Sequence, residues 1–107
     1  MNLGGSSDVS IAESAPGRIA VKGVLTFATA RQAREVGTLV LEASRANPIV
    51  VDCSAVSRAD SAGLAVLLDW LAWGRRHSRV VKLENLPAAL VAIAKISEVD
   101  ALLTATA

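Results

Sequence analysis

The chain has 107 residues, of which 52% are hydrophobic and 20% are charged, with 11 Lys and Arg against 10 Asp and Glu. This length suits one domain, and the apolar content is too high for a disordered chain. Because the net charge is only +1, the overall field favours neither nucleic acid nor an anionic membrane, and any partner must be recognised locally.

The first half of the chain predicts a hairpin and then a helix. Short, partly alternating apolar runs at 9–13 and 18–24 flank Pro16-Gly17, a dipeptide that favours a tight turn. From 29 to 46, apolar residues recur at spacings of three and four, as in an amphipathic helix. Asn47-Pro48 then ends this helix, since a residue before proline prefers extended geometry.

The second half predicts two further strands, each followed by a helix. The expected strands are 49–53 and 80–84, and the expected helices are 63–77 and a segment from Pro87 to about Ile96. Helix-length connections between strands imply parallel pairing, so the expected fold class is α/β, a mixed sheet of four or five strands with crossover helices.

The chain ends and the domain limits follow from composition. Residues 1–8 are expected to be a flexible tail, residues 9–103 a single domain in which 99–103 pack back on the core, and residues 104–107 a frayed end. The first ten residues lack the features of a secretory signal. The most apolar segment, 62–74, contains Asp69 and is well short of the roughly 20 residues that span a bilayer. We expect a cytoplasmic domain without direct membrane insertion.

Catalysis, metals and cofactors are not expected. Cys53 and His77 are the only residues of their types, and they are predicted to point towards opposite ends of the domain, so they form neither a metal site nor a nucleophilic pair. The lone cysteine suits a reducing compartment and a place in the core. Asp52 and Asp60 are expected near the same sheet edge, but no phosphate-binding glycine loop accompanies them.

The turn at Asp60-Ser61 is the main candidate site. It lies between a predicted strand and a predicted helix, at the end of the sheet where α/β proteins usually place their sites. Ser61 is a candidate N-cap, a candidate interface residue, and a candidate for phosphorylation, which would add nearly two negative charges at the positive end of the helix. Gly63 in an early helical turn costs about 1 kcal/mol relative to alanine, so we expect another backbone to approach it closely.

The helix after this turn has two apolar sides. One is lined with leucines and should face the sheet. The other side consists of Ala62, Val66, Asp69, Trp70, Trp73 and His77. Because tryptophan is enriched at interface hot spots, the hypothesis is that Ser61, Val66, Trp70 and Trp73 form a docking patch. The alternative is that a neighbouring helix covers both indole rings.

The stretch IVVDCSAVSRADSAGLAVLL, at 49–68, resembles the STAS family of sulphate transporters and anti-sigma factor antagonists. The resemblance lies in an apolar strand with Asp52, a short loop and the sequence DSAGL from Asp60. VLTFATA, DSAGLAVLLDWLAWGRR and NLPAALVAIAKISEVDALL are similar to the small STAS subunits of Mla phospholipid-transport complexes, which maintain the lipid asymmetry of the Gram-negative outer membrane.

This resemblance implies a STAS fold and a protein partner. In the Mla branch the expected partner is a cytoplasmic ABC ATPase subunit in a complex with a membrane permease, which would place the domain at the periphery of the inner membrane. In the anti-sigma branch, Ser61 is the expected phosphorylation site and its modification ends the interaction. The expected partner-binding residues are Asp60, Ser61, Ala62, Gly63, Val66, Trp70 and Trp73.

Overall fold

The computed structural model of the chain describes residues 8–97 and 99–104. The elements in chain order are β1 (Val9–Ala15), β2 (Arg18–Leu25), α1 (Ala30–Ala43), β3 (Ile49–Ala59), α2 (Ser61–Arg76), β4 (Val81–Glu84), α3 (Ala88–Ile96) and α4 (Asp100–Thr104). The α/β fold predicted from the sequence is confirmed. Most of the expected flexible tail, and residues 105–107 of the expected frayed end, lie outside the described residues.

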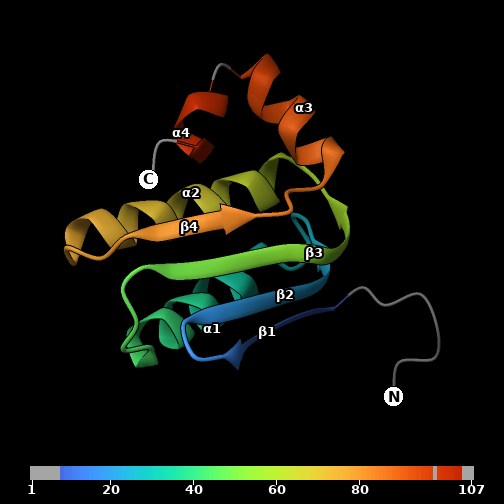
Figure 1. The fold of residues 1–107 in the computed structure, drawn as a ribbon. Coiled ribbons are helices and arrows are strands. Elements are labelled where there is room, and N and C mark those ends of the chain that lie inside the picture. The colour runs from blue at the N-terminus through green and yellow to red at the C-terminus, as the bar shows by residue number, and fades with distance from the viewer. Residues whose placement is uncertain (1–7, 98, 105–107) are drawn as a thin grey trace.

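The four strands form one mixed sheet in the order β1-β2-β3-β4. β1 pairs antiparallel with β2, whereas β2, β3 and β4 run parallel to one another. The carboxyl ends of these three strands therefore lie at one end of the sheet, where the chain turns into α1, α2 and α3 (Figure 1). This geometry gathers three connections that are far apart in the sequence.

β3 is longer than the sequence predicts, because pairing with β2 continues beyond the apolar run. The expected end was Cys53, but the pairing with β2 extends as far as Ala59, which lies opposite Leu25. The residues at 54–59 are mostly polar or small and mostly exposed, which removes the apolar signal on which the prediction depended. The longer strand moves Asp52 to the middle of β3 and leaves Asp60 directly after its end, so the expected proximity of these two residues at one edge is wrong.

α1 and α2 lie side by side on one face of the sheet, and α3 and α4 pack against α2 and β4 (Figure 1). As expected, the segment before the C-terminus packs back on the domain: Leu103 is buried, and Val99 contacts the core. α2 consequently has neighbours on three sides, namely the sheet, α1 and α3. Its exposed surface is a narrow stripe, and most of its circumference is buried.

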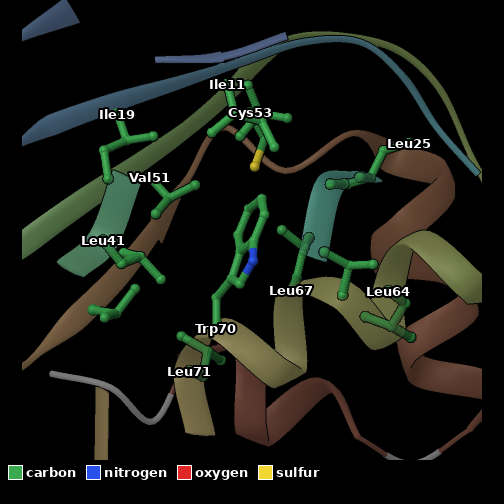
Figure 2. Packing of buried hydrophobic residues seen from close by; sticks show 14 of the residues in the cluster. Ile11, Ile19, Leu25, Leu41, Val51, Cys53, Leu64, Leu67, Trp70 and Leu71 are labelled. Atoms are coloured by element: carbon green, nitrogen blue, oxygen red, sulfur yellow. The ribbon is translucent and has the colours of Figure 1, made fainter. Parts of the chain in front are cut away.

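This environment contradicts the predicted second apolar face of α2. Val66, Trp70 and Trp73 are 0%, 1% and 4% exposed, so they belong to the core and not to an exposed docking patch. Figure 2 shows the Trp70 indole pointing from α2 towards the sheet, among the side chains of Val51 and Cys53. The prediction is wrong because it assigned α2 one buried face, whereas α1 and α3 cover the sides that the sheet leaves free.

Gly37 on α1 makes room for the Trp70 ring. A Cβ at position 37 would overlap the indole of Trp70, so only glycine allows α1 to lie this close to α2. Trp73 is covered differently, since His77 stacks on its ring at 4.5 Å between centroids and the Arg79 guanidinium lies 5.8 Å from the ring centroid.

The face of the sheet opposite α1 and α2 carries a charged network. The Arg18 guanidinium donates to Asp52 at 3.1 Å and lies 2.9 Å from the Glu84 carboxylate, so it bridges β2, β3 and β4. The Asn85 amide donates to Asp52 at 3.0 Å, and the Ser54 N–H donates at 2.9 Å. These hydrogen bonds, of which the one from Asn85 has the largest effect, hold the pKa of Asp52 far below its usual value.

The network predicts a specific loss of stability in acid. Because the pKa of Asp52 is lower in the folded than in the unfolded chain, its carboxylate stabilises the fold above about pH 4, and this contribution disappears as the pH falls further. Asp52→Asn should lower the urea midpoint at pH 7 and show a smaller further drop at pH 3 than the wild type. Asp69→Asn, which breaks an exposed ion pair with Arg34, should change the pH 7 midpoint little. An undiminished acid loss in Asp52→Asn would contradict this assignment.

Candidate interaction site at the start of α2

Asp60 is the N-cap of α2. Its backbone is extended, with φ −138° and ψ −169°, and its Oδ1 accepts hydrogen bonds from the N–H groups of Ala62 at 2.9 Å and Gly63 at 3.1 Å. These bonds satisfy two backbone donors that the first helical turn leaves without a partner. Of the alternatives for Ser61, the capping role therefore belongs to its neighbour, and Ser61 is the first helical residue.

Asp60 also connects α2 to the turn between β2 and α1. Its second carboxylate oxygen accepts the N–H of Phe27 at 3.1 Å. On the other side of this connection, a Cβ at Gly63 would overlap the carbonyl oxygen of Leu25, at the end of β2. The close backbone approach expected at Gly63 is thus confirmed, and the two turns form one compact unit.

The electrostatics of Asp60 follow from these contacts. Partial burial would raise the pKa of its carboxyl, but the N–H groups of Phe27, Gly63 and Ala62, together with the nearby charge of Arg58, hold the pKa below its usual value. Asp60 is therefore ionised at neutral pH. Three backbone N–H groups share its two oxygens, which suits a structural carboxylate better than a proton-transferring one.

Ser61 lies on the surface of this unit. Its side chain is exposed, and its hydroxyl makes no hydrogen bond with any residue in the described part of the chain. Its neighbours Asp60 and Ala62 are both half-buried. Of the seven expected partner-binding residues, Asp60, Ser61 and Ala62 are accessible, whereas Gly63, Val66, Trp70 and Trp73 are buried.

Two exposed residues beside Ser61 were not predicted from the sequence. Phe27 is 84% exposed, and its backbone is held by Asp60. Arg58, opposite Val24 in the pairing of β3 with β2, is exposed and acts on the pKa of Asp60. We call the group formed by Phe27, Arg58, Asp60 and Ser61 the Asp60 corner. The strand topology could have indicated these neighbours of Ser61. The carboxyl ends of parallel strands meet at one edge of a sheet, which brings the turns after β2 and β3 together.

Cys53 and His77 lie in different surroundings within the described part of the chain. Burial raises the pKa of the Cys53 thiol to about 12, and its side chain faces the core (Figure 2). His77 lies exposed at the other end of α2, where its ring stacks on Trp73. Within residues 8–97 and 99–104, no three His, Cys, Asp or Glu side chains are grouped so that they could hold a metal ion.

In the Asp60 corner the side chains of Phe27, Arg58 and Ser61 are exposed, and Asp60 is half-buried. Two open hollows lie at the other end of the sheet, around the β1–β2 turn and the end of α1, where their lining includes Pro16 and Arg45, and no residue of the Asp60 corner lines either of them. An exposed serine at the start of α2, an arginine near the end of β3 and an aromatic ring on the turn after β2 can contact another protein surface. The geometry therefore favours recognition by contact over the binding of a small molecule in a cavity.

A comparison with models of protein families shows to which family the chain belongs. The family model described as "Mlab, STAS domain" matches residues 10–104, which is nearly the whole chain. The chain belongs to the STAS domain family. The resemblance seen in the sequence around Asp60-Ser61 is thereby confirmed, and STAS domains mediate protein–protein interactions.

A solved structure shares the fold of this chain. The anti-sigma factor antagonist SpoIIAA in its unphosphorylated form matches with a TM-score of 0.65 and 14% sequence identity, over 86% of this chain and 82% of SpoIIAA. At this identity the likeness establishes the STAS fold alone. No curated protein sequence gives a significant match. Among the described residues of this STAS domain, no helix combines the length and the apolar character needed to cross a bilayer.

Proposed function

We propose that this STAS domain is a non-catalytic binding module that docks on the ABC ATPase subunit of a Mla-type phospholipid transporter and supports its assembly or activity. It would act in the cytoplasm, and its complex with the ATPase and permease would hold it at the periphery of the inner membrane. The match to the family model that carries the Mla name supports this choice of partner.

The observation that carries the proposal is the division of roles between Asp60 and Ser61. Asp60 satisfies the backbone donors at the start of α2, so the Ser61 hydroxyl is exposed and free of hydrogen bonds to the described residues. A polar group on a rigid turn can pair with a partner without first breaking an internal hydrogen bond. Binding to the assembled ATPase would stabilise that assembly by mass action and requires no chemistry from the module.

Substitution of Ser61 tests the proposal. Ser61→Glu should fold normally, since a carboxylate in the first turn of a helix is favourable, but it should weaken binding to the ABC ATPase subunit at least tenfold by placing a charge at the interface. The measurement is titration calorimetry with the purified ATPase subunit of the source organism's Mla-type transporter. Leu39→Glu, at an exposed position further along α1, is the matched control and should bind like the wild type. Failure of the wild-type chain to bind that ATPase would reject the proposal.

The second candidate function is that of an anti-sigma factor antagonist controlled by phosphorylation of Ser61. The exposed hydroxyl at a helix N-terminus favours it, since the positive end of α2 would stabilise a phosphate. Stoichiometric phosphate incorporation by the organism's anti-sigma factor kinase, abolished in Ser61→Ala, would establish this function. The absence of incorporation, together with ATPase binding, would leave the transporter role.

A further inference from the structure

Phe27 differs from the other aromatic residues of the chain in its surroundings. The chain has two tryptophans and one phenylalanine. Both tryptophans are in the core, whereas the Phe27 side chain is 84% exposed, in the Asp60 corner. A phenylalanine ring left in water contributes none of the free energy that its burial would provide. An exposed ring in this position suits a residue that becomes buried in a complex.

The turn that carries Phe27 is rigid before any partner binds. The Thr29 hydroxyl donates to the Val24 carbonyl at 2.7 Å and accepts the Thr26 N–H at 3.1 Å, which closes the turn around Phe27. The Phe27 N–H is bound in turn by Asp60. Because the backbone is already fixed, docking of the ring costs little conformational entropy.

A cation without an ion-pair partner among the described residues belongs to the same corner as the ring. Arg58 is exposed and forms no ion pair with any residue that the structure describes. α1 also begins at this end of the sheet; its described first turn contains no acidic residue and its N-cap makes no side-chain hydrogen bond, whereas the positive end of α2 is capped by Asp60. The carboxylate of Asp60 accepts hydrogen bonds from three N–H groups. A complementary surface therefore combines an apolar pocket with acidic residues at its edge.

We infer that Phe27 is the anchor of the interface, entering an apolar pocket on the ABC ATPase subunit, and that Arg58 pairs with a carboxylate at the edge of this pocket. The inference rests on the proposed function and names the chemistry of the partner surface. Ser61 lies beside the anchor, where a charge or a bulky group would prevent the ring from entering. Asp60 accepts hydrogen bonds from the backbone of Phe27 and from the first turn of α2, and these bonds fix the position of Ser61 relative to Phe27.

Truncation of the ring tests the inference. Phe27→Ala should weaken binding to the ATPase subunit about 30-fold in titration calorimetry, the effect of a hot-spot residue, and Phe27→Leu should restore part of the affinity. Ile96→Ala is the matched control, because Ile96 is 83% exposed and lies at the end of α3; it should bind like the wild type. Arg58→Glu should weaken binding about tenfold at low salt, and the difference should shrink at high salt.

The outcomes of these experiments distinguish a wrong assignment of the Phe27 anchor from a wrong proposed function, on which the anchor rests. If Phe27→Ala binds like the wild type while Ser61→Glu does not, the anchor is wrong and the proposed function stands. If the wild-type chain does not bind the ATPase subunit, both are wrong. The inference is also overturned if Phe27 contacts a second copy of the chain or a lipid surface in place of the ATPase subunit. The first would appear as wild-type dimers in sedimentation that Phe27→Ala abolishes, and the second as binding to anionic lipid vesicles that depends on Phe27.

Discussion

Trp70→Ala is expected to cost about 3–5 kcal/mol of the free energy of unfolding, the range for removing a large aromatic side chain from a core. The indole is 1% exposed and lies between the sheet and the helix pair, directly against Gly37 of α1 (Figure 2). Its removal would leave a cavity that several elements would have to close together. Such a loss is a large part of the 5–15 kcal/mol that typically stabilises a domain. Urea denaturation followed by far-UV circular dichroism measures it.

Two further variants make this result interpretable. Phe27→Ala removes an aromatic ring that is 84% exposed, and should change the unfolding free energy by less than about 0.5 kcal/mol. Trp70→Phe keeps most of the apolar volume, and the Trp70 N–H that it removes has no hydrogen-bond partner in the described residues, so it should cost less than Trp70→Ala. Should Trp70→Ala prove as stable as Phe27→Ala, the indole would lie at the surface, as the sequence pattern suggested.

Gly63→Ala is expected to destabilise the domain by about 3 kcal/mol, although alanine normally stabilises a helix relative to glycine by about 1 kcal/mol. The added Cβ would overlap the carbonyl oxygen of Leu25, which belongs to a paired strand and cannot rotate away. α2 would have to move away from the end of β2. The urea midpoint and the melting temperature should both fall.

Ser61→Ala is the control for Gly63→Ala, two residues earlier in the same helical turn. Its exposed hydroxyl makes no hydrogen bond with the described residues, so the unfolding free energy should stay within about 0.5 kcal/mol of the wild type. A stabilising effect of Gly63→Ala would show that the contact with Leu25 can relax. A large loss in Ser61→Ala would show that Ser61 shares the capping role with Asp60.

These contacts explain how a core position supports a surface site. Gly63 allows the start of α2 to lie against the end of β2, and this approach brings the Asp60 carboxylate within reach of the Phe27 N–H. Displacement of α2 by Gly63→Ala would therefore also alter the relation between Ser61 and Phe27. The expected consequence is weaker partner binding in a variant whose changed residue is itself buried.

Much of the fold was predictable from local patterns. The turn at Pro16-Gly17 and the helix start at Pro87 depend on backbone restrictions that act within a few residues. The first helix was predicted to end at Ala46, before Asn47-Pro48, but α1 already ends at Ala43, so the proline does not set its end. The sequence DSAGL identified the start of α2 and the family, since a capping residue and a close-packed glycine leave a local signature. The positions of α2 and of the Asp60-Ser61 turn were therefore correct to within two residues.

Tertiary structure alone decided which side of α2 is buried and which residues surround Ser61. Periodicity shows that Trp70 and Trp73 are apolar positions of a helix, but it does not show how many neighbours the helix has, and α1 and α3 cover what the sheet leaves free. Phe27 lies 34 residues before Ser61 in the printed sequence, and parallel pairing of β2 with β3 brings their turns together. The sequence by itself determined most of the elements, the resemblance to the family and the serine at the helix start, but not the length of β3 or the helix α4. The packing of elements far apart in the chain determined the surface around that serine, because burial and proximity depend on contacts that no local pattern contains.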